Sequence, residues 1–329
     1  MKLRRVRTGP DLHLELQSPQ GWVAVGKATA RLAPTLGDAG ERWRSDMVAL
    51  LGAPADARDA IAAAARDIDP EATREEDVVI PFAPRSYRDF MLFEAHAINA
   101  ARGFVHRFMP RIAPIVSTYE KVTGTTFPKL KPHALWYRQP VYYMGNHLTF
   151  VSDGDDVVMP SYTRALDYEL ELGFVLARPL LDAACETAEA AIGGFVVLND
   201  FSARDVQLAE MDSGFGPQKA KHFCNALSKV VVTADEILPR WRDLKGEVRL
   251  NGERIGEPTT AGARWSLGEV LAHASRCEPL QPGEFFGSGT LPGGSGIETG
   301  RLLAAGDRIE LGIKGIGTLT NRIVAGGAK

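Results

Sequence analysis

The chain has 329 residues, 45% of them hydrophobic, and a formal net charge of −3. This length suffices for a large core and suggests about two domains, and the small charge gives no long-range attraction to nucleic acid or to an anionic membrane. No apolar stretch approaches the roughly 18 residues of a membrane span, and no signal-peptide core follows the basic N-terminus.

The three cysteines, Cys185, Cys224 and Cys277, are far apart and form no CxxC pair. This pattern is typical of free thiols in a reducing compartment and argues against a zinc or disulfide framework. We therefore expect a cytoplasmic protein whose partner is a small molecule.

The first 80 residues predict a small β-rich domain with a helical segment. Residues 1–35 predict short strands around the turn at 18–21, and the Ala-rich stretch within 45–67 predicts a helix. The run 78–85 predicts a strand that ends in a Pro-bounded loop. We place the domain boundary there, ahead of a catalytic, metal-binding domain over 81–329.

Residues 89–102 predict a helix, because apolar side chains recur with helical spacing from Phe90 to Ala100. Asp89 and His96, seven positions apart on this helix, would face the same way. A carboxylate and an imidazole on one stripe suit a metal ligand and a general base. The alternative is an N-cap Asp and an unrelated His.

Residues 166–175 predict a strand on which Glu169 and Glu171 point to the same side. Two carboxylates that close repel each other unless a proton or a cation lies between them. A hard divalent metal satisfies this requirement. For an isolated pair of this kind, a solvated strand face is the ordinary alternative.

A second acidic position, Asp200, ends the apolar strand at 195–199. Ser202 then predicts a helix start, with Asp205 as its capping partner. Acids at strand ends commonly line open sites, although Asp200 would also suit a simple turn. Gln207 lies on the opening turns of this helix, where it reaches the same site or faces solvent.

Further basic and glycine-rich positions follow. Lys221 would balance a carboxylate cluster and stabilise a substrate anion, whereas Lys219 is expected to be exposed.

The glycine-rich run 284–300, with Thr290 and Glu298, predicts a functional loop that acts as a lid or a nest of N–H groups, with a plain surface turn as the alternative.

Regular elements are expected elsewhere in the second half. Residues 180–191 and 266–275 predict helices, Asn251 and Gly252 predict a hairpin turn, and 307–324 predict strands. The sequence contains no complete dinucleotide or phosphate-binding fingerprint, no GxSxG and no HExxH.

Taken together and in this order, these segments resemble the fumarylacetoacetate hydrolase family over residues 80–325. The agreement lies in Asp-x6-His at 89–96, Leu-Asp-x-Glu-Leu-Glu at 166–171, Asn-Asp-Phe-Ser-Ala-Arg-Asp-Val-Gln at 199–207, Gly-Pro-x3-Lys-x-Phe at 216–223 and Gly-Thr-x7-Glu at 289–298. The resemblance implies an α+β, mainly β fold, with a mixed β-sandwich roll and a homodimer.

The resemblance also implies the site residues. The metal ligands fall on Asp89, Glu169, Glu171 and Asp200. This oxygen-only set independently favours Mg²⁺, Ca²⁺ or Mn²⁺ over Zn²⁺. The catalytic residues fall on His96, Glu298 and Lys221. The substrate-binding residues fall on Gln207, Tyr143, Thr290 and Arg107, with Arg102 as the alternative arginine.

The implied activity is metal-dependent hydrolysis of a C–C bond in a β-diketone or acylpyruvate through a metal-stabilised enolate, with His96 as general base. The substrate would resemble fumarylacetoacetate or fumarylpyruvate. Met211 stands where fumarylacetoacetate hydrolase has a Tyr, and the following loop is one residue longer, which disfavours fumarylacetoacetate itself. The alternatives are a decarboxylase or keto–enol isomerase of a β-keto acid such as oxaloacetate or an aromatic-catabolism intermediate, and a non-catalytic binding protein.

Overall fold

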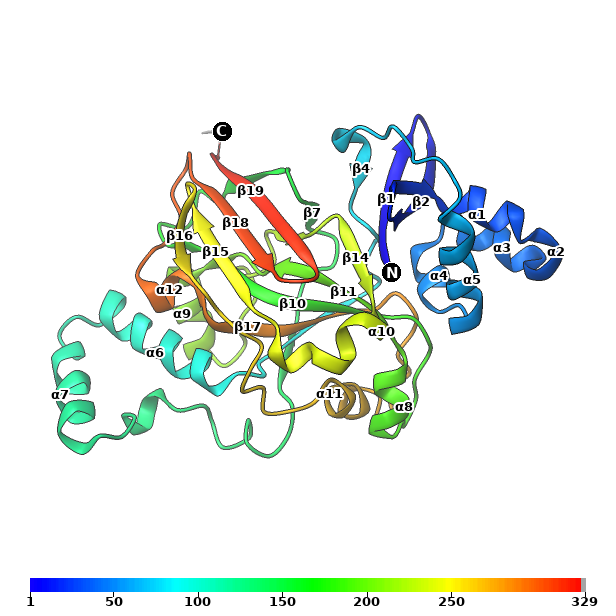
Figure 1. Cartoon of the computed structure of the whole chain (residues 1–329). Coiled ribbons are helices and arrows are strands. Elements are labelled where there is room, and N and C mark those ends of the chain that lie inside the picture. The colour runs from blue at the N-terminus through cyan, green and yellow to red at the C-terminus, as the bar shows by residue number, and fades with distance from the viewer. Residues whose placement is uncertain (327–329) are drawn as a thin grey trace.

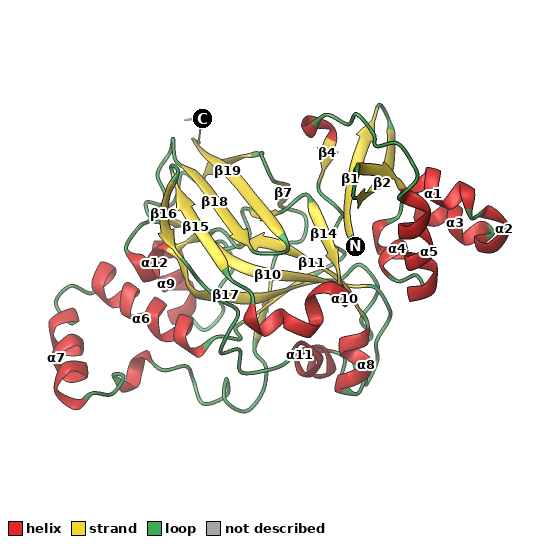
Figure 2. Ribbon diagram, in the orientation of Figure 1, coloured by secondary structure: helices red, strands yellow, loops and turns green. Residues whose placement is uncertain are grey.

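Two β-sheets packed face to face form the centre of the chain in the computed structural model, which describes residues 1–326 (Figure 1). Helices lie around the sheets rather than between them (Figure 2). A group of short N-terminal helices covers one end of the molecule, and two helices from the middle of the chain lie at the other end.

The strands are β1 (Lys2–Thr8), β2 (Asp11–Ser18), β3 (Gly21–Ala24), β4 (Val78–Val79), β5 (Tyr87–Phe90), β6 (Tyr142–Met144), β7 (Phe150–Ser152), β8 (Asp156–Met159), β9 (Leu166–Asp167), β10 (Glu169–Leu176), β11 (Ile192–Asn199), β12 (Ser202–Ala203), β13 (Asn225–Leu227), β14 (Val230–Thr233), β15 (Gly246–Leu250), β16 (Glu253–Gly256), β17 (Phe285–Ser295), β18 (Arg308–Ile313) and β19 (Gly317–Ala325).

The helices are α1 (Val25–Arg31), α2 (Ala33–Leu36), α3 (Asp38–Trp43), α4 (Met47–Leu51), α5 (Ala55–Ala65), α6 (Glu94–Phe108), α7 (Ala113–Thr123), α8 (Cys185–Ala190), α9 (Arg204–Asp212), α10 (Ala234–Ile237), α11 (Leu267–Ala274) and α12 (Gly296–Thr299). Short 3₁₀ turns lie at Glu75–Asp77, Pro128–Leu130 and Leu238–Asp243.

The large sheet runs in the order β3-β2-β1-β14-β11-β10-β17-β5-β6, and β4, β7 and β13 pair beside this path. The smaller sheet runs β16-β15-β18-β19-β8, and β9 pairs only with β12. Both larger sheets are mixed, because β17 pairs with β5 in parallel and β19 does the same with β8. Strands far apart in the sequence thus meet at the centre of the large sheet.

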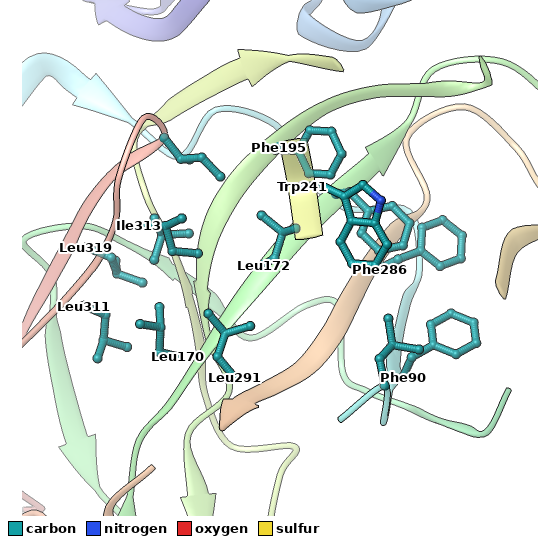
Figure 3. Close-up of a cluster of buried hydrophobic side chains, with 14 of the residues drawn as sticks. Phe90, Leu170, Leu172, Phe195, Trp241, Phe286, Leu291, Leu311, Ile313 and Leu319 are labelled. Atoms are coloured by element: carbon teal, nitrogen blue, oxygen red, sulfur yellow. The ribbon is translucent and has the colours of Figure 1, made fainter. Parts of the chain in front are cut away.

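Apolar side chains from the facing sheets form the main core (Figure 3). Leu170 and Leu172 of β10 belong to the same buried cluster as Leu311 of β18. Phe174 of β10 stacks on Phe286 of β17 with ring centroids 5.3 Å apart, a contact that contributes about 0.5–1.5 kcal/mol beyond burial alone. Strands β10 and β11 are buried along their whole length. The apolar sequence of β11 predicts this, whereas the burial of β10 includes the carboxylates of Glu169 and Glu171.

The N-terminal segment continues the large sheet. Strand β1 pairs antiparallel with β14, with Leu3 opposite Val231. A second core cluster then joins Leu14 and Ile61 of this segment to Phe285 of β17. The domain boundary near residue 80 stays a prediction, and the N-terminal segment shares both a sheet and a core with the rest of the chain.

Several predicted elements are present in the structure. The hairpin β15–β16 turns at Asn251 and Gly252, whose φ angles of 54° and 83° are those of a type I′ turn. Helix α11 begins at a capping box formed by Ser266 and Glu269. The helical segment within 45–67 forms α4 and α5, and the C-terminal strands form β18 and β19.

Four local predictions were wrong. Residues 1–35 were expected to form short strands only, but α1 begins at Val25 and α2 at Ala33. Asp89 lies in strand β5 and the helix begins only at Glu94, because pairing with β17 and β6 outweighs the local helical spacing. The glycine-rich run is mostly the long strand β17 rather than a loop. Ser202 does not cap α9: its Oγ donates to the carbonyl of Asp200, and Asp205 accepts hydrogen bonds from Thr163 and Arg164.

No helix within residues 1–326 combines the length and the apolar character that crossing a membrane requires.

Close packing of α6 against α12 is tested by substituting Gly103, because a Cβ there would overlap the carbonyl oxygen of Ile297. Removing a helical Gly normally stabilises by about 0.5–1 kcal/mol, but overpacking costs typically about 1–3 kcal/mol. We expect Gly103→Ala to lower the free energy of unfolding in urea. The control Gly26→Ala in α1, where the nearest atom would be 3.7 Å away, should leave it unchanged or raise it. Equal effects would contradict the packing argument.

Candidate metal centre and active site

Three carboxylates from different parts of the large sheet lie close together near its centre. Asp89 comes from β5, Glu171 from β10, and Asp200 follows the end of β11. All three are buried, and one oxygen of each lies within 4.8 Å of the other two. Strand β17 lies between β5 and β10, and a Cβ at its Gly287 would overlap Asp89 Oδ1 and approach Glu171 Oε2 to 2.6 Å. The glycine therefore leaves the space in which the two carboxylates meet.

Burial and mutual repulsion make this cluster electrostatically unfavourable without a cation. Burial, followed by the neighbouring carboxylates, raises the pKa of Asp89 and of Glu171 well above the usual range. Burial also raises the pKa of Asp200, although Lys221 opposes this shift. These acids are protonated, or balanced by positive charge, when the protein is folded.

The donor set fits a hard divalent cation. All three groups offer oxygen, and buried Asp200 Oδ1 has no hydrogen-bond partner among residues 1–326. The N–H of Gly289 donates to Asp89 Oδ1 at 3.2 Å and to Glu171 Oε2 at 3.1 Å. This shared donor orients both carboxylates. Oxygen-only sites suit Mg²⁺, Ca²⁺ or Mn²⁺.

Glu169 borders the cluster but bonds mainly to cations of the protein itself. It accepts a hydrogen bond of 2.6 Å from Arg204 and forms an ion pair with Lys221, which also pairs with Asp200. Burial would raise the pKa of Glu169, but Arg204 and Lys221 outweigh burial and hold it far below the usual range. Glu169 is therefore ionised beside the three acids, and its role as a fourth ligand stays a prediction.

His96 lies on α6 and is paired with Glu298 of α12. Its Nδ1 is 3.0 Å from Glu298 Oε2, and its Nε2 faces Glu169 Oε1 at 3.7 Å. Ser295 Oγ donates to Glu298 Oε2 at 2.8 Å, and the N–H of Gly293 donates to Oε1 at 3.0 Å. The carboxylate is thus fixed on one side of the imidazole, and the other ring nitrogen is directed towards the acidic cluster.

The remaining predicted site residues differ in their placement. Tyr143 Oη donates to Asp200 Oδ2 at 2.8 Å, Thr290 Oγ1 is 3.5 Å from Glu171 Oε1, and Gln207 Oε1 accepts from Arg204 at 2.9 Å. Burial, followed by the nearby Asp200, raises the pKa of Tyr143 well above its usual range, so its hydroxyl stays protonated.

The two candidate arginines lie on α6, away from these contacts. Arg107 is exposed near the end of the helix. Arg102 pairs with Glu120 of α7 at 2.9 Å. Lys219 is exposed, as expected.

Sequence reasoning missed Arg204 and Asp167. Arg204, 2% exposed, joins Asp167 to Glu169. Both positions lay within the quoted motifs: Asp167 is two residues before Glu169 on the same strand pattern, and Arg204 is one turn before Gln207. The alternation that identified Glu169 and Glu171 would have identified Asp167 if it had been followed one step back.

Comparison with known families matches residues 121–324 to the family described as "Fumarylacetoacetate (FAA) hydrolase C-terminal", which is more than half of the chain. The chain belongs to the fumarylacetoacetate hydrolase family. Asp89, His96 and the two candidate arginines, Arg102 and Arg107, precede the matched residues, and the other residues of the candidate site lie within them.

Curated relatives include the mitochondrial oxaloacetate tautomerase FAHD1 of Homo sapiens, which is 28% identical over 185 residues that span 56% of this chain and 81% of the relative. The oxaloacetate tautomerase YisK of Bacillus subtilis is 30% identical over 186 residues, 56% of this chain and 61% of the relative. A bifunctional isomerase/decarboxylase of 4-hydroxyphenylacetate degradation from Escherichia coli is 25% identical over 248 residues, 69% of this chain and 56% of the relative.

Solved structures share the fold over most or nearly all of the chain. A putative HpcE protein from Mycobacterium smegmatis has a TM-score of 0.68 at 23% identity, covering 98% of this chain and all of that chain. The fumarylacetoacetate hydrolase of Exiguobacterium antarcticum has a TM-score of 0.67 at 21% identity, covering 99% and 100%. A fumarylpyruvate hydrolase from Pseudomonas aeruginosa, in complex with Mn²⁺ and pyruvate, has a TM-score of 0.56 at 21% identity, covering 79% of this chain and 99% of that chain. The predicted α+β, mainly β fold of the family is confirmed.

The raised pKa values of Asp89, Glu171 and Asp200 predict how metal and pH act together on stability. A carboxyl whose pKa is raised by folding contributes stability below its ordinary pKa of about 4, and this contribution is lost as pH rises through the raised value. A bound cation replaces the protons, so Mn²⁺ should raise the unfolding temperature more at about pH 8 than at about pH 5.5. Thermal unfolding with and without Mn²⁺ measures this. A larger shift at the lower pH would contradict the assignment.

A substitution that neutralises Glu171 should separate two effects of the acidic cluster: its destabilisation of the metal-free fold and its binding of the cation. In Glu171→Gln one buried charge is removed, so the metal-free protein should unfold at a higher temperature than the wild type at about pH 8. The same change removes a charged ligand and should weaken Mn²⁺ binding in calorimetric titration by at least about tenfold. The half-buried Glu247 lies on the small sheet, and Glu247→Gln should change neither quantity. Unaltered Mn²⁺ binding would remove Glu171 from the site.

Proposed function

We propose that this chain is a divalent-metal-dependent enzyme that hydrolyses a C–C bond in a β-diketone or acylpyruvate. The observation that carries the proposal is the pairing of His96 with Glu298, with Nε2 of the imidazole directed towards Glu169 at the edge of the buried acidic cluster. Hydrolysis needs both a Lewis acid and a base for water, and these residues supply places for both.

The cation would be held by Asp89, Glu171 and Asp200, with Glu169 as the fourth carboxylate. When bound, it would withdraw electron density from the substrate carbonyl and favour the enolate form of a departing keto acid. The Mn²⁺ and pyruvate bound to the fumarylpyruvate hydrolase support a divalent cation next to a keto acid. Mg²⁺, Mn²⁺ and Ca²⁺ all fit oxygen-only ligands.

His96 is the general base of this mechanism. Because Nδ1 faces the carboxylate of Glu298 at 3.0 Å, the proton is held there and Nε2 is left as the acceptor. Nε2 takes a proton from water while Glu298 stabilises the imidazolium. The hydroxide then attacks the carbonyl carbon, the neighbouring C–C bond breaks, and its electron pair leaves with the keto-acid fragment.

Two buried cations and three polar groups would surround that fragment. Lys221 and Arg204 would stabilise the negative charge that develops as the bond breaks. Gln207, Tyr143 and Thr290 would orient substrate oxygens, and Arg107 would need to approach from the end of α6. With the divalent cation bound, these groups together would suit a dicarboxylic or diketo acid. We further propose a cytoplasmic homodimer, as the family resemblance implies.

Keto–enol tautomerisation is the second candidate, because the human and Bacillus subtilis relatives are named oxaloacetate tautomerases. The Escherichia coli isomerase/decarboxylase likewise supports chemistry without water as a nucleophile. Such reactions need the cation and a proton donor, but they do not need an activated water.

A substrate screen distinguishes these activities. The protein is incubated with acylpyruvates, fumarylpyruvate, fumarylacetoacetate and oxaloacetate, each with Mg²⁺ or Mn²⁺ and with excess chelator. Chromatography detects both C–C cleavage fragments, the enol absorbance of oxaloacetate follows tautomerisation, and released pyruvate reports decarboxylation. Metal-dependent production of two acids supports hydrolysis, whereas loss of enol absorbance without cleavage of any substrate supports the tautomerase.

Removing the proposed base tests the mechanism. His96→Ala should lower kcat for C–C cleavage by about 10²–10⁴-fold, because general-base catalysis contributes about that much. Mn²⁺ binding should persist, since the imidazole is not among the three clustered ligands. The exposed imidazole of His106 lies on the same helix, so His106→Ala serves as the control. Undiminished turnover by His96→Ala would refute the base role.

A further inference from the structure

One buried carboxylate outside the predicted site makes four hydrogen bonds in two directions. Asp167 is completely buried at the end of β9. Its Oδ1 accepts from the N–H groups of Tyr168 at 2.8 Å and Gly296 at 2.7 Å. Its Oδ2 accepts from the N–H of Ile297 at 2.9 Å and from Arg204 Nε at 2.7 Å. Both oxygens are thus occupied by protein donors, so Asp167 is not available as a metal ligand.

The first direction leads to the base. Gly296 and Ile297 begin α12, and Glu298, the next residue, holds Nδ1 of His96. A Cβ on Gly296 would overlap Asp167 Oδ1, so the helix approaches the carboxylate as closely as its backbone allows. The position of Glu298 therefore follows the position of Asp167.

The second direction leads to the acidic cluster. Arg204 donates through Nε to Asp167 and through a terminal nitrogen to Glu169 at 2.6 Å, and its other terminal nitrogen reaches Gln207. A guanidinium fixed at all three nitrogens has one orientation. Asp167 thus sets the angle at which Arg204 meets Glu169.

We propose that Asp167 is a positioning residue that holds the His96–Glu298 pair in register with the acidic cluster. It acts through the first turn of α12 and through Arg204, and it touches neither substrate nor cation. This inference rests on the proposed function, because the register matters only if a base must reach a group held at the cluster. Misplacement by about 1 Å is enough to reduce such a reaction strongly.

Asp167→Asn is the direct test, because the side chain keeps its size while one oxygen becomes a donor that faces other donors. Asp46 offers a matched control: its carboxylate caps α4 through Ala49 N–H at 3.0 Å and accepts from Arg42 Nε at 3.2 Å, far from the site. We expect Asp167→Asn to lower kcat about 10–100-fold, as loss of an outer-shell partner typically does. Mn²⁺ affinity should stay within about threefold, and Asp46→Asn should leave both quantities unchanged.

A double-mutant cycle separates positioning from general support of the fold. If Asp167 acts through Glu298, then adding Asp167→Asn to Glu298→Gln should change kcat by less than about threefold. Full multiplication of the two losses, or loss of Mn²⁺ binding in Asp167→Asn, would overturn the proposal. If Asp167→Asn does not fold, Gly296→Ala replaces it, since its Cβ would separate α12 from the carboxylate while keeping the charge.

A measurement that does not depend on turnover can distinguish two outcomes. It shows whether the positioning role of Asp167 is wrong or whether the proposed function is wrong. Long-range ¹H–¹⁵N spectra report which imidazole nitrogen carries the proton, and His96→Ala assigns the signal. The wild type and Asp46→Asn should show the Nδ1–H form, and Asp167→Asn should lose it. An unchanged His96 signal would overturn the positioning role. A wild type that turns over none of the substrates would instead refute the proposed function and leave the spectra to decide the geometry.

Discussion

The repulsion between buried carboxylates governs the arrangement of this molecule. Asp89, Glu171 and Asp200 meet where water is excluded, and ionised Glu169 lies beside them. In such surroundings like charges interact far more strongly than at the surface. Two buried cations, Lys221 and Arg204, offset part of this repulsion. Their pKa values are raised, because attraction to the neighbouring acids outweighs the effect of their own burial.

The long strand β17 makes this concentration of charge geometrically feasible. It lies between β5 and β10, and the missing side chain of Gly287 leaves room for the carboxylates of both neighbours. Its next glycine, Gly289, has a φ of +78° and turns an N–H towards the same two acids. The strand then runs into α12, which carries Glu298. A single segment thus provides the space, the backbone donor and the partner of the base.

The sequence predicted which residues lie close together in the candidate site better than it predicted the local structure around them. Glu169, Glu171, Asp200 and Lys221 could be found because each lies in a motif whose residue types and order are specific as a set. Asp89 was assigned to a helix because its strand depends on pairing with β17, about 200 positions away, which local spacing does not contain.

The glycines of β17 also led to a wrong prediction, that of a loop, because of contacts with distant parts of the chain. Their purpose is to leave room for partners elsewhere in the fold, so the composition resembles that of a flexible segment. Strand alternation could have singled out Asp167 as a further buried acid, but only the folded arrangement shows that Arg204 joins it to Glu169.

The pairing of β1 with β14 has a consequence for how the chain can be divided. A protein starting at residue 81 would lack β1, and β14, with Val230, Val231 and Val232, would lose its neighbouring strand on one side while still pairing with β11 on the other. An uncovered edge of valines is a template for strands from other molecules. The N-terminal segment therefore also acts as a cover against self-association, and shortened forms of the chain would be expected to aggregate before their catalysis could be judged.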